Sequence, residues 1–481
     1  MIRRYLAACL IFAAAAIAQK VTGPIPVTAD SHPLLAADHN LTPMDLSKIG
    51  YVEEEFLVSG TANVYDWAAD GSVNVKTPNA PYATRILVRR PADASRFNGT
   101  VVVELPNTAR RFDWSMLWGY VHNYVTDSGA AWVGITMPGA VPGLKKFNPT
   151  RYAAVSFANP TPNEACPAGG VPGRGGEATS DQEDGLRWDA ISQVGALIKS
   201  GNLPGLKAQR AYLTTQGADL VTYISAIQPH AKVYDGFVLK SPGGPGRINR
   251  CAPAPGRGDP RQIIHNSGVP VIGVLTQGEV VDSQPFLRPD SDDLADRFRI
   301  YEIAGAAHID AAPYIALPAV VDQNAAGGAQ GTPNWPFNAR CEPEIPLQQF
   351  PLQSYVLNAA FANLDAWVKQ GTPAAKAPRM EVKDGKIALD PFGNGQGGVR
   401  SPYVDVPTAS YFTTTPGPGT CRELGYEVRF DWARLDSVYG GYKNYASKVE
   451  QSVDRMVKDR FLTEADAKRM KAELLAPSHG N

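Results

Sequence analysis

The chain has 481 residues, and its 46 basic residues nearly balance its 47 acidic ones, which gives a formal net charge of -1. The chain therefore has no excess of positive charge that would attract nucleic acid or an anionic membrane. We expect neither as a partner and favour a small neutral ligand. No low-complexity linker or internal repeat divides the chain, and we predict a single elaborated domain over residues 19–481.

The first eighteen residues have the organisation of a secretory signal peptide. A basic start at Arg3 and Arg4 precedes the apolar residues 5–17, and the small residues around Ala18 suit a cleavage site. The apolar run is shorter than the roughly 20 residues that span a bilayer. We therefore expect residues 1–18 to be removed and the mature protein to be exported to the periplasm or the medium, with no membrane contact.

Four cysteines remain once Cys9 is removed with the signal peptide, and an even number in an oxidising compartment predicts one or two disulfides. Three pairings are open. The wide spacing, without any Cys-x-x-Cys, argues against a zinc site. The four cysteines are Cys166, Cys251, Cys341 and Cys421.

Strand-like runs alternate with helix-like segments between residues 83 and 308. Apolar strands without polar alternation, separated by helices, indicate a mostly parallel sheet covered on both faces, so the predicted fold class is α/β. A last core helix and a helical C-terminal tail at about residues 440–475 follow. The predicted strands are residues 85–88, 100–105, 131–136, 237–239, 269–275 and 298–303, and the predicted helices are residues 116–126, 188–199, 220–227 and 355–370.

His308 is the candidate catalytic base. It follows the predicted strand 298–303 through small residues that let an imidazole emerge at a sheet edge. Glu279 comes just after the strand 269–275 and is the candidate acid that orients this base; Asp282 is the alternative. An acid followed by a histidine is the chain order of α/β-hydrolases.

Several stretches in one order resemble the exported α/β-hydrolase-domain proteins of bacteria, a family with esterase-like members. The resemblance covers nearly all of the mature chain and implies the α/β-hydrolase fold and a serine nucleophile in a Gly-x-Ser-Gln turn, the nucleophile elbow, at the start of a helix. The stretches are residues 99–104, 131–134, 188–195, 220–224, 234–237, 301–308 and 397–402.

The elbow of this chain has no serine and is about three residues short. If Gln216 matches the glutamine of the family motif, Thr215 takes the place of the serine; without a gap, Thr214 does. A β-branched threonine is crowded and costly at strained elbow angles. Ser241 is a further candidate nucleophile brought in from elsewhere.

Two hypotheses follow from these residues. The first is a carboxylic-ester hydrolase that uses Thr215, His308 and Glu279. The second is a pseudoenzyme that keeps the hydrolase body as a ligand-binding or scaffold protein. Asn107 and Thr108, after the strand 100–105, are weak candidates for oxyanion donors, because loops often carry such residues as turn formers. We predict no metal and no organic cofactor.

Overall fold

The computed structural model describes residues 19–166, 180–217, 219–244, 246–256, 258–328, 341, 352–417 and 419–476. The predicted signal peptide, residues 1–18, lies outside the described residues. Within the described part, none of the helices combines the length and the apolar character needed to cross a bilayer.

Nine strands in the described part form one twisted sheet in the order β1-β2-β3-β5-β4-β6-β7-β8-β9. Strands β5, β4, β6, β7, β8 and β9 run parallel to one another. The pairs β1–β2, β2–β3 and β3–β5 are antiparallel. The predicted α/β class with a mostly parallel core sheet is therefore confirmed. The strands are β1 (Lys20–Thr22), β2 (Tyr51–Trp67), β3 (Val73–Pro91), β4 (Thr100–Leu105), β5 (Ala131–Ile135), β6 (Arg210–Gln216), β7 (Gly236–Lys240), β8 (Val271–Thr276) and β9 (Phe298–Ile303).

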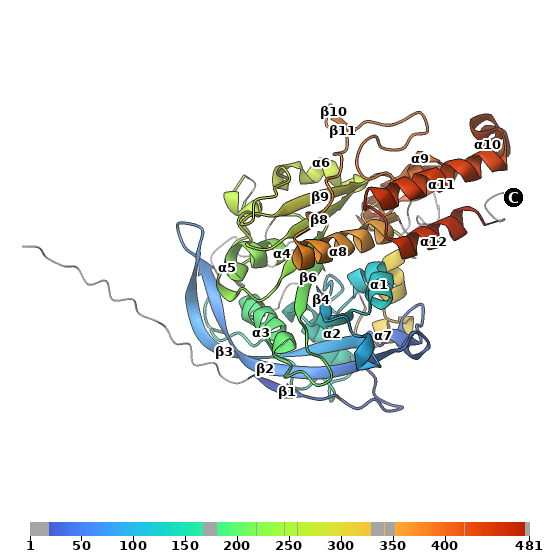
Figure 1. Cartoon of the computed structure of the whole chain (residues 1–481). Helices are drawn as coiled ribbons and strands as arrows, with labels where there is room; N and C mark the ends of the chain where they lie inside the picture. Colours follow the sequence, from blue (N-terminus) through green and yellow to red (C-terminus); the bar gives the residue numbers. More distant parts are fainter. Residues whose placement is uncertain are drawn as a thin grey trace, which may run out of the picture.

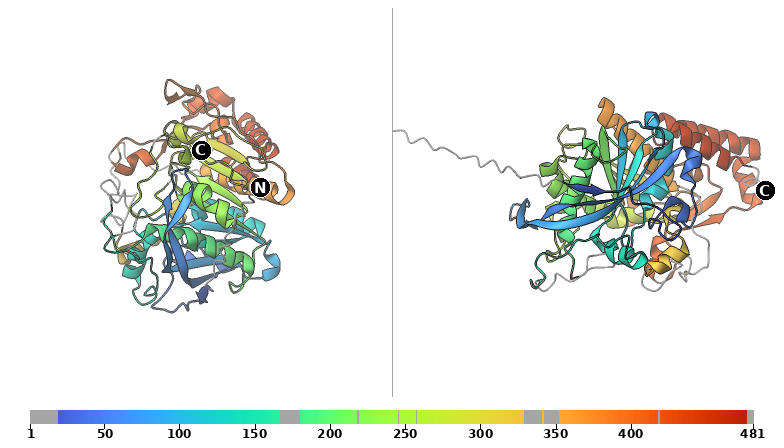
Figure 2. Two further views of the ribbon diagram at one scale, coloured as in Figure 1. Left: turned by 90° about the vertical axis from the view of Figure 1, so that its left-hand side faces the viewer. Right: turned by 90° about the horizontal axis from the view of Figure 1, so that it is seen from below.

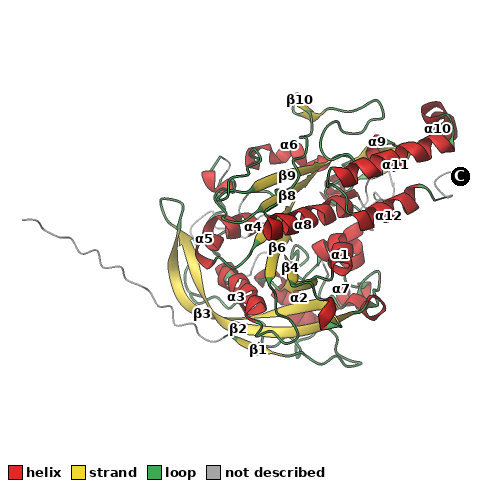
Figure 3. Cartoon of the chain, in the orientation of Figure 1, coloured by secondary structure: helices red, strands yellow, loops and turns green. Residues whose placement is uncertain are grey.

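Helices cover both faces of the sheet (Figures 1 and 3). Residues of α1 and α8 contribute to the apolar cluster on one face, and residues of α3 and α4 to the cluster on the other. The main helices are α1 (Met116–Ser128), α2 (Val141–Phe147), α3 (Arg187–Ser200), α4 (Asp219–Thr222), α5 (Gln228–Ala231), α6 (Val280–Ser283), α7 (Val320–Ala325), α8 (Leu352–Gln370), α9 (Pro402–Asp405), α10 (Trp432–Tyr439), α11 (Tyr442–Lys458) and α12 (Glu464–Leu474).

The apolar strands are buried on both faces, as their composition predicts. In β4, Val102 belongs to the cluster under α1 and α8, whereas its neighbours Val101 and Val103 belong to the opposite cluster. Successive side chains of a strand point to opposite faces, so each of these valines buries its side chain against a helix layer. Such burial contributes about 1.5–3 kcal/mol per side chain, which fixes the register of the core strands.

The long hairpin of β2 and β3 was only partly predicted. The expected strand at residues 85–88 is the end of a strand of 19 residues, and the 17-residue partner β2 was missed. The polar residues Glu53 and Glu54 interrupt the apolar pattern of β2, but they pair with arginines of β3 across the hairpin. Figures 1 and 2 show that the tip of this hairpin lies on the opposite side of the molecule from the C-terminal helices α11 and α12.

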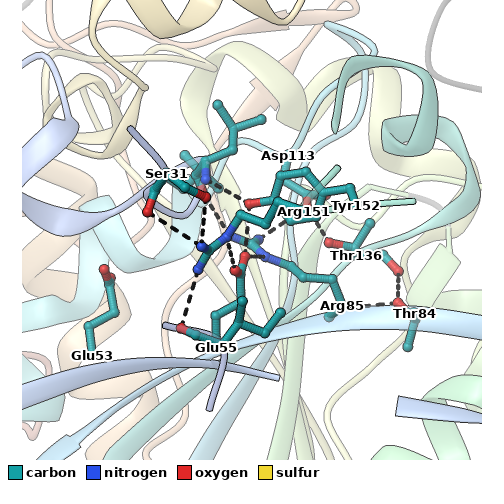
Figure 4. Close-up of polar contacts among 12 residues, drawn as sticks. Ser31, Glu53, Glu55, Thr84, Arg85, Asp113, Thr136, Arg151 and Tyr152 are labelled. Carbon is teal, nitrogen blue, oxygen red and sulfur yellow. Dashed lines mark hydrogen bonds and ion pairs between the residues drawn. The ribbon is translucent and has the colours of Figure 1, made fainter. Parts of the chain in front are cut away.

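A buried ion cluster fastens the N-terminal segment to this hairpin (Figure 4). Glu55 of β2 accepts hydrogen bonds from Arg85 of β3 at 2.7 Å and from Arg151 at 2.6 Å. Arg151 also donates to Ser31 Oγ at 3.1 Å. Charges are retained in a protein interior only when they are paired, so the three residues depend on one another.

Two disulfides join distant parts of the chain. Cys166 is bonded to Cys251 and Cys341 to Cys421. This fits the prediction of one or two bridges and selects one of the three pairings left open by the sequence.

Candidate active site

The predicted acid and base meet at the carboxyl ends of the parallel strands. Glu279 ends the short turn Gln277–Glu279 after β8, and His308 lies five positions beyond the end of β9. The order of the strands reverses between β4 and β6, and in open α/β sheets ligands bind at the carboxyl ends of the strands at such a reversal. Gln216, the last residue of β6, lies at the same edge of the sheet, next to His308.

His308 and Glu279 form a direct pair, in which Nδ1 of the imidazole contacts Oε1 of the carboxylate. The other carboxylate oxygen accepts the main-chain N–H of Thr276 at 2.8 Å, which closes a capping box at the end of β8. An ionised carboxylate only accepts hydrogen bonds, so Nδ1 of His308 carries the proton and Nε2 is left as the acceptor. This is the tautomer that a general base requires.

Lys240, the last residue of β7, supplies a buried positive charge to the pair. Its Nζ donates to Ser241 Oγ at 2.9 Å and to the carbonyl oxygen of His308 at 3.0 Å. Burial by itself raises the pKa of Glu279, but the charge of Lys240 and the interaction with His308, with the hydroxyl of Ser241, outweigh it and hold this pKa at about 2. Burial likewise lowers the pKa of Lys240, whereas Glu279 and Asp310 oppose that shift.

Gln216 occupies the position facing Nε2 of His308. Its amide nitrogen lies 2.9 Å from that ring nitrogen and donates to it, given the tautomer above. The amide oxygen Oε1 is buried and has no hydrogen-bond partner among the described residues. In the sequence Gln216 is only a marker for aligning the elbow, and nothing in the local pattern predicts this contact.

The two predicted threonines point elsewhere. The hydroxyl of Thr215 donates to the carbonyl oxygen of Leu105 in β4 at 2.7 Å, and that of Thr214 to Val238 in β7 at 2.8 Å. Both side chains are buried within the sheet. The expected contact of Thr215 with His308 is thus corrected: the structure brings Gln216, one residue later, to the imidazole.

Gly217 directly follows β6 and has a backbone conformation that favours glycine. Its φ of 114° lies in the left-handed region, which a side chain disfavours and an elbow nucleophile adopts under strain. A Cβ built on Gly217 would meet no atom within 4 Å. Space for a side chain therefore remains at the strained position, where this chain carries only a hydrogen.

The remaining candidates have other partners. Asp282 is exposed on α6, so Glu279 is the acid that contacts the histidine. Ser241, at a φ of 54°, accepts from Lys240 and bonds to Glu279 rather than to the imidazole. Asn107 exchanges two main-chain hydrogen bonds with Trp114, and its side chain accepts the N–H of Ala109, as a turn former does.

The chain was compared with curated proteins, with solved structures and with models of protein families. None of the curated proteins matches the chain. Among solved structures, esterase Est22 is similar at 13% identity, with 58% of this chain and 81% of that chain covered and a TM-score of 0.30.

A putative dienelactone hydrolase from Klebsiella pneumoniae subsp. pneumoniae has 13% identity, coverages of 51% and 85% and a TM-score of 0.25. Carboxyl esterase 2 from Tuber melanosporum has 10% identity, coverages of 55% and 79% and a TM-score of 0.29. Scores this low support no statement about activity. The model of the alpha/beta hydrolase domain family, in contrast, matches residues 21–472. The chain therefore belongs to the alpha/beta hydrolase domain family.

Proposed function

We propose that the protein is an exported hydrolase of small neutral carboxylic esters in which His308 and Glu279 activate a water molecule in place of an elbow serine. The observation that carries the proposal is the environment of the imidazole: Nδ1 is fixed by Glu279, and Nε2 faces an amide instead of a hydroxyl. An amide is not a nucleophile, so hydrolysis at this base requires water to attack the ester directly.

The reaction proceeds by general base catalysis. Nε2 of His308 accepts a proton from water while the water oxygen bonds to the carbonyl carbon of the ester. The tetrahedral intermediate then collapses, the carbon–oxygen bond to the alcohol breaks, and the imidazolium returns its proton to the leaving alkoxide. A carboxylic acid and an alcohol leave, and His308 is neutral again.

Glu279 stabilises the imidazolium formed in the first step. With its pKa held at about 2, this carboxylate is ionised throughout the neutral range. It keeps the proton on Nδ1 and compensates the developing positive charge, the role of the acid in catalytic triads.

Gln216 positions the water. Its half-buried side chain rotates the amide away from Nε2 to admit the water, and Oε1, which has no hydrogen-bond partner among the described residues, accepts the second water hydrogen. Glutamine orients an attacking water in the same manner in some phosphate hydrolases. The near-zero charge of the chain is consistent with a neutral substrate.

Export is supported by the composition of residues 1–18 and by the two disulfides, since disulfides persist in oxidising compartments. Cell fractionation tests this part of the proposal. Recovery of the protein in the cytoplasm with residues 1–18 still attached would contradict it.

The catalytic proposal is tested by hydrolysis of short-chain aryl esters. We expect His308→Ala to lower the rate about 10²- to 10⁴-fold, the usual contribution of a positioned base. His230→Ala, which removes an exposed histidine of α5, is the matched control and should leave the rate unchanged. A fluorophosphonate probe, which labels activated serines, should not label the wild-type protein.

A second function is favoured by one specific contact. The amide nitrogen of Gln216 donates a hydrogen bond to Nε2 of His308, so the lone pair of this nitrogen is not free to accept a proton from water. Such a contact suits a protein that binds esters without hydrolysing them. Equal hydrolysis by the wild type and His308→Ala, together with saturable quenching of tryptophan fluorescence by the intact ester, would replace the hydrolase by this binding protein.

A further inference from the structure

Two histidines of the N-terminal segment and an aspartate of α7, all of residue types that bind metals in other proteins, come together in the structure. Nε2 of His32 lies 3.1 Å from Oδ2 of Asp322, and Nδ1 of His39 lies 4.0 Å from the same oxygen. One ligand atom from each of the three residues falls within 4.8 Å of the others. The two imidazoles are stacked, with ring centroids 3.6 Å apart.

Asp322 and His39 are held together by the backbone. Asp322 is a buried residue of α7, and the residue before that helix, Ala319, donates its N–H to the carbonyl oxygen of His39 at 2.8 Å. The N–H of Leu41 bonds to Leu317 at 2.8 Å, so the two segments run side by side. This pairing presents the imidazole of His39 to the carboxylate.

His32 is fixed by independent contacts. Its neighbour Ser31 bonds to Arg151 of the buried ion cluster, and Figure 4 shows the serine beside that guanidinium. The ring of Phe147 meets the ring of His32 edge-on, with centroids 5.3 Å apart. The position of His32 is therefore set by the fold rather than by its contact with Asp322.

We propose that His32, His39 and Asp322 bind one zinc ion. Two imidazole nitrogens and a carboxylate oxygen are ligands that zinc accepts, whereas calcium and magnesium prefer oxygen alone. At zinc–ligand distances of about 2.0–2.1 Å, tetrahedral ligand atoms lie roughly 3.3 Å apart. The contact of His32 with Asp322 already has about this spacing.

The third ligand has room to adjust. The side chain of His39 is 41% exposed, so its ring can tilt out of the stack and close the remaining gap to the ion. Both imidazoles line a surface cavity of about 570 Å³, which leaves the fourth position to water. The acidic side chains of Asp38 and Asp45 line the same cavity and favour a cation, whereas Glu53, which also lines it, is paired with Arg89.

The charge of Asp322 supports a bound cation. In the described part of the chain, the side-chain contacts of this buried carboxylate are with the two imidazoles, and these carry charge only when protonated. A buried carboxylate without a positive partner is costly, and a divalent ion supplies one. The zinc site would clamp the segment around His32 and His39 to α7. It departs from the prediction of no metal, because these residues meet only in three dimensions.

The test is a zinc titration of the untagged protein after removal of metals by a chelator, followed by calorimetry. We expect one ion per chain, a rise in the temperature of unfolding with added zinc, and Co²⁺ absorption bands of a four-coordinate nitrogen and oxygen site. His39→Ala and Asp322→Asn should each weaken binding at least about tenfold. The matched control is His265→Ala, since His265 is an exposed histidine whose ring nitrogen lies 3.8 Å from a single carboxylate, that of Asp296.

Two results would overturn the proposal. The first is no stoichiometric zinc binding by the wild-type protein, which would leave a stacked histidine pair hydrogen-bonded to Asp322. The second is zinc binding that His39→Ala and Asp322→Asn leave as strong as in His265→Ala, which would place the ion elsewhere. Circular dichroism of each variant verifies that it is folded, and the exposed position of His39 makes its removal the milder change.

Discussion

At the scale of single residues, the tautomer of His308 is set by its partners. The carboxylate of Glu279 fixes one ring nitrogen and the amide of Gln216 the other, while Lys240 holds the carboxylate charged. The charge of Glu279 is thus part of the stability of the fold as well as of its chemistry, and this has a consequence for the pH dependence of unfolding.

The pKa of Glu279 is lowered from 4.5 to about 2 in the folded protein. A lowered acid pKa stabilises the fold fully above the unfolded value, and this contribution is lost as the pH falls from about 4.5 towards 2. We expect the difference in the free energy of unfolding between the wild type and Glu279→Gln to shrink by about 3 kcal/mol from pH 5 to pH 2, at about 1.4 kcal/mol per pKa unit. Urea unfolding at each pH measures it.

The control for this series is Glu381→Gln, because the side chain of Glu381 is 51% exposed and pairs with Lys383 at the surface. The difference in the free energy of unfolding between Glu381→Gln and the wild type should stay nearly constant from pH 5 to pH 2. A difference for Glu279→Gln that is equally flat would contradict the strong interaction of this carboxylate with Lys240 and His308.

At the scale of elements, Gly217 directly follows β6, where the family motif predicts the nucleophile elbow. The strained φ falls on Gly217, where a side chain would meet open space. We expect Gly217→Ser to gain fluorophosphonate labelling that disappears when His308 is also replaced by alanine, at a cost of about 1–3 kcal/mol in stability for the strained backbone.

Thr215→Ser is the matched control for this position, since it places a serine two residues earlier, inside β6, with its hydroxyl on the carbonyl oxygen of Leu105. It should remain unlabelled. Labelling of Thr215→Ser but not of Gly217→Ser would show that the hydroxyl at position 215 reaches the base, and would reinstate the sequence-based assignment.

At the scale of the whole molecule, the ion cluster around Glu55 joins β2, β3 and the segment at Arg151, which are distant in sequence. Removing one partner of a buried ion pair leaves uncompensated charges, so we expect Glu55→Gln to lower the free energy of unfolding by about 3–5 kcal/mol. Chemical denaturation followed by circular dichroism measures the loss.

The adjacent residue provides the comparison. Glu54 pairs with Arg90 on the partly exposed side of the same hairpin, where an ion pair contributes about 0–1 kcal/mol. Glu54→Gln should therefore cost little. Equal losses in the two variants would mean that burial does not distinguish the two pairs.

The sequence by itself determined the alternation of apolar strands and helices, and through it the placement of Glu279 and His308. Parallel strands bring their carboxyl ends to one edge, so residues that follow β8 and β9 must lie near each other. This local pattern did not extend to β2, whose polar residues find partners only across the hairpin.

Only the tertiary structure decided which residue faces the base, which cysteines pair and which histidines approach Asp322. Side chains of a strand alternate between faces, so a shift of one residue turns Thr215 towards a neighbouring strand and Gln216 towards His308. His32 and Asp322 are 290 positions apart. Contacts over such a separation depend on how the layers pack, which no local pattern of residues records.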